Sequence, residues 1–355
     1  MATPIIKLLI VDDSALMRKT LRDLFVSLKR YEVQTARNGA DALEQIDRFN
    51  PDVVTLDVNM PEMDGLTCLS HVMARFPRPV VMVSSITRRG AQATLEALAL
   101  GAVDFVEKPG GTVSLDIEKV REEIVAKVDA ATRARPRMAK AIASAARSRI
   151  EASAPKARPS AGDRTIAGLV LVGVSTGGPR TLEDIVPVLP ASFPWPVIVA
   201  QHMPAAFTAS FAARLDTMSA LHVQEVSSAT PLARGNVYIG RGGADVVVER
   251  MLGRAIVKSV PEDDKFRWHP SVDRLVASAT KSLPPSSLVG VQLTGMGDDG
   301  ARAMTELLKA GGRTIAEDAS TAIVFGMPGE LIRLGGATKV LPCDHIATQL
   351  NAWIY

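Results

Sequence analysis

The 355-residue sequence predicts two α/β domains, each a doubly wound parallel sheet, joined by a flexible linker. In the first 125 residues, short apolar β-type runs alternate strictly with amphipathic stretches, and the alternation resumes after residue 165. Strict alternation implies right-handed crossovers and a parallel sheet covered by helices on both faces. We place the first domain at residues 4–125, the linker at 130–164 and the second domain at 165–353.

The first domain consists of five strand–helix units. Its expected strands are Ile5–Val11, Val33–Ala36, Val53–Leu56, Val80–Val83 and Asp104–Val106. The amphipathic stretches are Ala15–Leu28, Ala40–Phe49, Leu66–Ala74 and Ala91–Leu100, with a last one from about Leu115. Ser14 stands where a helix N-cap belongs, and Gly101 stands where the fourth helix should stop.

The segment between Ala131 and Arg164 accounts for the net charge of +3. It holds nine of the 41 Lys and Arg residues and two of the 38 Asp and Glu residues, so the rest of the chain has a net charge of −4. Pro136, Pro155 and Pro159 interrupt any long helix there. We expect a solvated linker and no nucleic-acid partner, with a weak contact to an acidic surface as the alternative.

The second domain repeats the alternation and adds an antiparallel insertion. Its expected strands are Leu169–Val174, Val197–Ala200, Val237–Ile239, Val246–Arg250, Ala255–Ser259 and Leu288–Leu293. Its expected helices are Arg180–Val188, Ala206–Leu215, Val272–Thr280, Ala301–Ala310 and Asp344–Trp353. Gly253 predicts a hairpin turn between the fourth and fifth of these strands.

Two global features limit where the chain works. Cys68 and Cys343 are its two cysteines and cannot form a disulfide framework, which favours a reducing compartment and hence the cytoplasm. No stretch approaches the ~20 apolar residues that cross a bilayer. We therefore expect a protein that is not embedded in a membrane.

Three aspartates are expected to meet at one edge of the first sheet. Asp12 and Asp13 follow its first strand, and Asp57 ends the third. The carboxyl ends of parallel strands share one edge, where ligands bind. Crowded carboxylates need a neutralising cation, and hard oxygen ligands suit Mg²⁺. Ser84 and Lys108 end two further strands and suit a phosphoryl oxygen, so the set predicts an aspartate that accepts phosphate.

These residues resemble the receiver domain of bacterial response regulators. The matching motifs are Val11-Asp12-Asp13-Ser14, Leu56–Gly65 and Lys108-Pro109. The resemblance implies that Asp57 takes phosphate from a histidine kinase, and that the three aspartates hold Mg²⁺ with the Asn59 carbonyl. It also implies that Ser84, Lys108 and Phe105 form the phosphoryl switch. Phe105 stands where the family often has Tyr, so one hydrogen bond of that switch is absent.

A second candidate site begins at a glycine-rich turn. The strand Leu169–Val174 leads into Gly173-Val174-Ser175-Thr176-Gly177, which has the pattern GxSxG and precedes a helix. Small residues around the serine permit a sharp turn that exposes its hydroxyl beside backbone N–H groups able to stabilise an oxyanion. Ser175 is a candidate nucleophile. The alternative is an incidental serine in a glycine-rich turn.

A nucleophilic serine needs a base, and the base needs a carboxylate to orient it. His202 follows the next strand, at the same expected sheet edge as Ser175. Asp298 and Asp299 lie in the loop after the strand Leu288–Leu293. The chain order is thus Ser…His…Asp, whereas α/β-hydrolases have the order Ser…Asp…His.

The loop that carries these aspartates has a competing interpretation. Gly295, Gly297 and Gly300 form GxGxxG between a strand and a helix, with Glu317 about 20 residues later, as in dinucleotide-binding proteins. The two aspartates, however, stand where a pyrophosphate would bind and would repel it. We therefore favour a catalytic loop.

The second domain resembles the chemotaxis protein-glutamate methylesterases. The matching motifs are Gly173–Pro179, Gln201–Pro204, Arg234–Ile239, His269–Asp273 and Thr294–Gly300. The resemblance implies Ser175 as nucleophile, His202 as base and Asp299 as orienting acid. It also implies that Thr176 and Met296 shape the histidine and oxyanion environment, and it assigns no cofactor to the hydrolase reaction.

Together the resemblances predict an enzyme of chemosensory adaptation that phosphorylation activates. Its expected reactions are hydrolysis of glutamate methyl esters and deamidation of specific glutamines on methyl-accepting chemoreceptors, with a chemotaxis histidine kinase as phosphodonor. We expect contact between the domains to restrain activity until Asp57 is phosphorylated. Two alternatives are a transcriptional regulator, which would carry a compact helix-turn-helix effector, and a phosphorylation-gated binding module with an inactive hydrolase fold.

Overall fold

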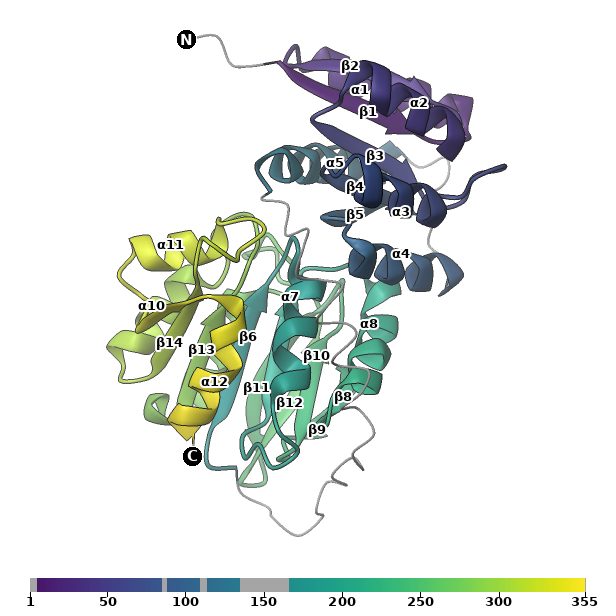
Figure 1. The fold of residues 1–355 in the computed structure, drawn as a ribbon. Helices are drawn as coiled ribbons and strands as arrows, with labels where there is room; N and C mark the ends of the chain where they lie inside the picture. Colours follow the sequence, from purple (N-terminus) through teal and green to yellow (C-terminus); the bar gives the residue numbers. More distant parts are fainter. Residues whose placement is uncertain (1–4, 85–87, 109–113, 135–165, 355) are drawn as a thin grey trace. The chain divides into compact units, whose positions relative to one another are not determined.

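The computed structural model describes residues 5–84, 88–108, 114–134 and 166–354. The chain divides into two compact units, residues 1–141 and 142–355 (Figure 1). From residue 135 onward the expected linker lies outside the described residues. No helix of the described part is long and apolar enough to cross a membrane.

The first unit contains a five-stranded sheet in the order β2-β1-β3-β4-β5, and every pair in it is parallel. Its strands are β1 (Ile6–Val11), β2 (Tyr31–Ala36), β3 (Val53–Asp57), β4 (Val80–Ser84) and β5 (Asp104–Glu107). Its helices are α1 (Ala15–Ser27), α2 (Gly39–Phe49), α3 (Gly65–Arg75), α4 (Arg88–Leu100) and α5 (Ser114–Arg133).

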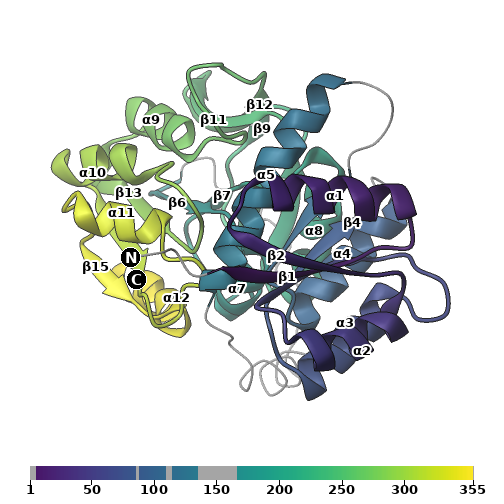
Figure 2. The same cartoon turned by 90° about the horizontal axis from the view of Figure 1, so that it is seen from above.

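Helices cover both faces of this sheet. Side chains of α1 and α5 share one apolar core with β1, β3, β4 and β5, while α2, α3 and α4 pack against one another in sequence (Figure 2). The Ser14 side chain accepts the Met17 N–H as the N-cap of α1. Helix α5 continues past residue 125, the expected domain end, because Val128 and Ala131 belong to the core.

The second unit contains a seven-stranded sheet in the order β15-β14-β13-β6-β7-β10-β8, and all its pairs are parallel. Its strands are β6 (Leu169–Val174), β7 (Val197–Gln201), β8 (His222–Val226), β10 (Asn236–Gly240), β13 (Leu288–Gln292), β14 (Arg313–Glu317) and β15 (Lys339–Leu341). A separate antiparallel sheet contains β9 (Thr230–Pro231), β11 (Asp245–Met251) and β12 (Arg254–Val260).

Helices again form two layers (Figure 1). Side chains of α9 (Val272–Ser282), α10 (Ala301–Lys309) and α11 (Met327–Arg333) share an apolar core with the sheet. On the other face α7 (Gly178–Ile185) packs against α8 (Ala205–Met218) and α12 (Cys343–Ile354). The chain runs from β6 to β7 on one side and later returns to β13 on the other, so β6 lies at the topological switch point.

The structure confirms the predicted α/β class, the two parallel sheets and the hairpin, in which Gly253 adopts a φ of +79°. The prediction missed β8, β9, β14, β15 and α11. Strand β8 contains three half-buried and two buried residues, and β14 carries the fully buried polar residues Thr314 and Glu317 in place of an apolar run. These segments therefore lack the continuous hydrophobicity that marks a central parallel strand.

Candidate functional site

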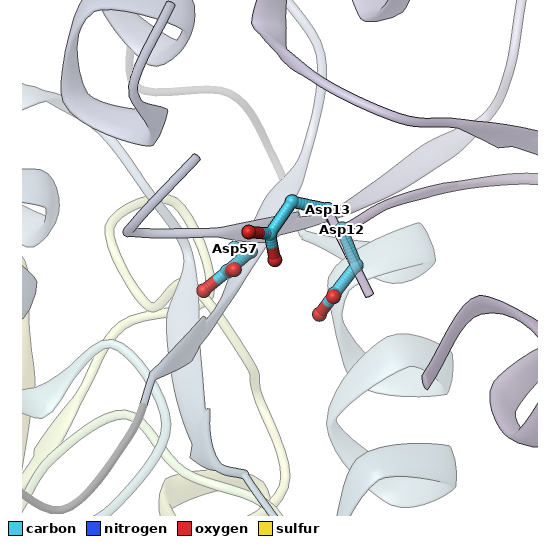
Figure 3. Close-up of side chains that lie close together, drawn as sticks. All are labelled: Asp12, Asp13 and Asp57. Carbon is cyan, nitrogen blue, oxygen red and sulfur yellow. The ribbon is translucent and has the colours of Figure 1, made fainter. Parts of the chain in front are cut away.

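Three carboxylates meet at the carboxyl edge of the first sheet (Figure 3). Asp12 and Asp13 follow β1 and Asp57 ends β3, and one oxygen of each lies within 4.8 Å of the others. Asp12 and Asp57 are buried, whereas Asp13 is exposed. Lys108, directly after β5, joins the two buried carboxylates, since its Nζ lies 2.8 Å from Asp12 Oδ2 and 2.7 Å from Asp57 Oδ2.

The charges of this pocket do not balance. Burial raises the pKa of Asp57, and the charge of Asp12 adds to the effect, although the hydrogen bond and attraction of Lys108 oppose it. Burial alone would lower the pKa of Lys108, but its contacts with both aspartates raise it. Three carboxylates face one ammonium, so the pocket retains negative charge that a divalent cation with oxygen ligands would neutralise. The donor set fits Mg²⁺.

The other residues predicted for this pocket lie on neighbouring strands. Ser84 is fully buried at the end of β4, and its carbonyl accepts the backbone N–H of Lys108 at 2.8 Å. Phe105 is buried in β5, and the Nζ of Lys127 from α5 lies 5.1 Å from its ring centroid. Asn59 is exposed, and its backbone N–H donates to Asp57 Oδ1 at 3.3 Å.

Three adjacent strand ends of the second sheet form the other candidate site. Ser175 follows β6, His202 follows β7, and the loop 293–300 follows β13. The Ser175 backbone N–H donates to the Thr294 carbonyl at 2.9 Å. A Cβ on Gly295 would lie 2.7 Å from the Ser175 Cβ, so glycine permits the close approach of loop and nucleophile turn.

The turn at Ser175 leaves two backbone donors available. Gly177, with a φ of +77°, starts α7 as its N-cap, so the serine stands just before a helix N-terminus. The backbone N–H groups of Thr176 and Met296 make no hydrogen bond with another described residue. The Thr176 carbonyl accepts the Thr294 hydroxyl at 2.9 Å, which ties the turn to the loop 293–300. Both N–H groups are therefore available to a ligand at this edge of the sheet.

His202 and Asp299 are in direct contact. The His202 Nε2 lies 2.9 Å from Asp299 Oδ2, and an ionised carboxylate there assigns the imidazole proton to Nε2. The other ring nitrogen, Nδ1, is buried and has no hydrogen-bond partner among the described residues. Nδ1 is therefore the ring nitrogen that can accept a proton, and the Ser175 hydroxyl makes no hydrogen bond within the described chain. Such bonds often form only once substrate is present.

The Asp299 carboxylate sits on the N-terminus of α9. It accepts the backbone N–H groups of Val272 at 2.7 Å and Asp273 at 3.0 Å, and the Ser271 hydroxyl at 3.1 Å. Burial would raise the pKa of Asp299, but the hydrogen bond and attraction of His202 and these backbone N–H groups outweigh burial and lower it. Asp299 is thus ionised where an orienting carboxylate must be.

The geometry of the loop 293–300 favours a catalytic loop over a dinucleotide-binding loop. Gly297 and Gly300 both have a φ of +89°, and the turn between them directs the buried Asp299 toward His202. Asp298 is exposed. The dinucleotide interpretation does not account for a buried carboxylate bonded to a histidine, whereas a catalytic loop does.

Sequence reasoning missed an aromatic side chain at this site. The Trp268 ring stacks on the His202 ring with centroids 5.7 Å apart and planes 4° apart. Trp268 also lines a cleft of about 490 Å³, together with Asp299 and residues of α10 and α11. No strand or helix pattern surrounds Trp268, so the sequence held no signal that could place it against a distant histidine.

The fold and the two sites define a class: a phosphoacceptor-type α/β unit followed by an α/β unit with a serine–histidine–aspartate set. A family model described as "CheB methylesterase" matches residues 170–350, and one described as "Response regulator receiver domain" matches residues 8–118. The chain belongs to the CheB methylesterase family and carries a response regulator receiver domain.

Curated relatives match the chain almost end to end. A Rhodospirillum rubrum protein named "Protein-glutamate methylesterase/protein-glutamine glutaminase 3" is 54% identical and aligns with 98% of this chain and 96% of its own length. A Rhodopseudomonas palustris protein of the same kind is 51% identical, with 98% of each chain covered. The crystal structure of the Thermotoga maritima CheB methylesterase catalytic domain is 39% identical, with a TM-score of 0.50, over 52% of this chain and 96% of that one.

Proposed function

We propose that the chain hydrolyses glutamate γ-methyl esters, and deamidates specific glutamines, on methyl-accepting chemoreceptors under control of its receiver domain. The proposal rests on one observation above all: the buried contact between His202 Nε2 and Asp299 at the switch point beside Ser175. It agrees with the activities after which the curated relatives are named.

In the proposed reaction, Ser175 Oγ attacks the ester carbonyl while His202 Nδ1 takes its proton. The N–H groups of Thr176 and Met296 stabilise the oxyanion. The C–O bond to the methoxy group breaks, methanol leaves with the proton from His202, and an acyl-serine remains. Water, deprotonated by His202, then hydrolyses this ester to glutamate. With a glutamine side chain, ammonia leaves in place of methanol.

The receiver domain supplies the control. In our proposal Asp57 accepts a phosphoryl group from a chemotaxis histidine kinase. Mg²⁺ bound by Asp12, Asp13, Asp57 and the Asn59 carbonyl would offset the negative charge of the carboxylates and the phosphoryl oxygens. Lys108 and Ser84 would then contact those oxygens, and Phe105 would repack. The buried Lys108 contacts with Asp12 and Asp57 support this assignment.

The same proposal places the protein in the cytoplasm, with the first domain ending after α5, later than the expected residue 125, and the second domain starting near residue 165. Both cysteines are buried, and neither is part of a disulfide, as suits a reducing compartment. We propose that contact between the domains restrains the hydrolase until Asp57 is phosphorylated, because a linker keeps the domains at a high effective concentration.

Methanol release from methylated receptor membranes tests the function. Full-length protein should release methanol, and a small phosphodonor with Mg²⁺ should accelerate the release. Ser175→Ala should abolish release with and without the donor, whereas Asp57→Asn should keep the basal rate and lose the acceleration. A fragment of residues 165–355 should exceed the unphosphorylated full chain.

Two results would contradict the proposal. Undiminished release by Ser175→Ala would remove the serine from the mechanism. Receptor binding by the wild-type protein without any release would favour the binding-module alternative.

A further inference from the structure

The catalytic imidazole has an incomplete set of hydrogen bonds. His202 is held by one contact, from Nε2 to Asp299, while Nδ1 has no partner among the described residues. The covalent link through Cβ and this hydrogen bond still allow the ring to rotate about the line that joins them. A contact with the face of the ring can restrict that rotation.

Trp268 supplies a flat surface for that purpose. Its ring lies parallel to the imidazole within 4°, with the centroids 5.7 Å apart, inside the range of offset-stacked aromatic pairs. The loop 293–300 contacts the Trp268 ring from another element: a Cβ on Gly297 would lie 2.9 Å from Trp268 Cζ2. The Arg267 guanidinium also lies 5.4 Å from the Trp268 ring centroid. The indole therefore lies against both His202 and the loop that carries Asp299.

A flat surface positions a ring only if the surface is itself fixed, and Trp268 lies in a segment without helix or strand. The anchor is Asp245, the first residue of β11, which is 0% exposed. Its carboxylate accepts from His269 Nδ1 at 3.1 Å, from the Ser271 N–H at 2.7 Å and from Arg274 Nη1 at 2.6 Å.

The Arg274 guanidinium also donates to the Pro261 carbonyl at 2.8 Å. Residues 261 and 271, on either side of Trp268, are therefore both tied to the Asp245–Arg274 pair.

We propose that Trp268 is a positioning residue for the base of this enzyme, and that Asp245 holds it in place without contacting the reacting atoms. Stacking keeps Nδ1 directed at the serine hydroxyl, so it raises turnover and leaves substrate affinity nearly unchanged. The kinetic part of this inference rests on the proposed function, whereas the stacking itself is measurable without any substrate.

The substrate-free test is the NMR signal of the His202 ring protons. Protons over an aromatic face are shielded, so Trp268→Leu, which keeps apolar bulk without a face, should move these signals downfield. Trp268→Phe should retain most of the shielding, and Asp245→Asn should reduce it although Trp268 is intact. His202→Gln assigns the signals among the five histidines. Trp353→Leu is the matched control, because that tryptophan lies on α12 against Arg313.

The kinetic test is methanol release by the same variants of the full chain. Trp268→Leu should lower kcat about tenfold with KM changed less than about twofold, and Trp268→Phe should restore most of kcat. Unshifted His202 signals in Trp268→Leu would overturn the stacking. A rise in KM at constant kcat would also overturn the inference, because it would make Trp268 a substrate contact. Methanol release by the wild type, and its loss in Ser175→Ala, test the proposed function. The His202 NMR signals in the Trp268 variants test the stacking. Either proposal can therefore fail without the other.

Discussion

At the scale of single residues, the two sites shift the pKa of Asp299 and of Asp57 in opposite directions. Asp299 is surrounded by donors at a helix N-terminus, which lower its pKa. Asp57 has Lys108 but also the neighbouring Asp12, and burial raises its pKa. The surroundings of Asp299 therefore stabilise its ionised form. The surroundings of Asp57 destabilise its ionised form, which a bound cation or phosphorylation would relieve.

Asp299→Asn should lower kcat about 10³- to 10⁴-fold, because the amide does not hold the required imidazole tautomer. The pKa of Asp299 lies below its ordinary value of 3.8, so its contribution to stability is complete above that value and is lost as the pH falls through the lower folded pKa. Thermal unfolding should show a difference between wild type and variant that becomes smaller as the pH falls below about 4. A difference that grows as the pH falls below about 4 would contradict this sign.

Asp57→Asn should stabilise the receiver unit at pH 7. Because the folded pKa of Asp57 is raised, ionisation of this carboxyl costs stability above the folded pKa, and the neutral amide removes the cost. Lys108 keeps its pair with Asp12. Mg²⁺ should raise the melting temperature of the wild type by mass action and do so less in the variant. Differential scanning fluorimetry with and without Mg²⁺ measures both effects, and equal Mg²⁺ shifts would exclude Asp57 from the metal set.

At the scale of elements, glycines in the loops let three strand ends approach one another. Gly300 is the N-cap of α10 with a φ of +89°, and a Cβ there would lie 2.4 Å from Val272 Cγ1. Val272 is the first residue of α9 and donates its N–H to Asp299. Packing at Gly300 and the position of the carboxylate are therefore coupled.

Gly300→Ala and Gly311→Ala form a matched pair. Gly311 has a similar φ of +96°, but a Cβ there meets nothing within 4 Å. Gly311→Ala should cost the backbone strain alone, about 1–2 kcal/mol, and keep activity. Gly300→Ala should cost a further 1–3 kcal/mol and lower kcat, because the clash displaces the start of α9. Urea unfolding and methanol release measure the two effects. Equal losses for the pair would mean that the clash is relieved without moving Asp299.

Much of the element layout was predictable, since Leu169–Val174 and the other central strands are continuous apolar runs between helices. The strand ends that carry Ser175, His202 and Asp299 followed from this layout. The choice between Asp298 and Asp299 did not follow from it, because neighbouring residues in a loop differ only in the direction of their side chains. Trp268 was also beyond prediction, because its place depends on the buried Asp245 cluster.

At the scale of the whole molecule, each unit has its own apolar core. The core of the first unit contains Leu8, Phe25 and Val128, and that of the second contains Leu171, Leu275 and Met304. Each core is closed by its own sheet and helices. The units should therefore unfold as separate cooperative transitions.

Calorimetry of the full chain should resolve two transitions, or one broad transition whose two components shift independently. Asp57→Asn should move the receiver component alone, and Gly300→Ala should move the hydrolase component alone. The 165–355 fragment assigns the second component. A single transition that both substitutions shift equally would show that the units unfold as one body.

Because Nε2 of His202 contacts Asp299, the two ring nitrogens of this histidine should differ in their reactivity toward alkylating reagents. A methyl group on Nε2 of His202 would remove the proton donated to Asp299, while one on Nδ1 would block the nitrogen that we propose as the base. Because Nε2 carries the proton shared with Asp299, Nδ1 holds the lone pair, and a small alkylating reagent that reaches the ring should yield the Nδ1 adduct. Peptide mass spectrometry, with the two isomeric methylhistidines as standards, can identify which nitrogen of His202 is methylated. The methylated nitrogen would then report the orientation of the ring.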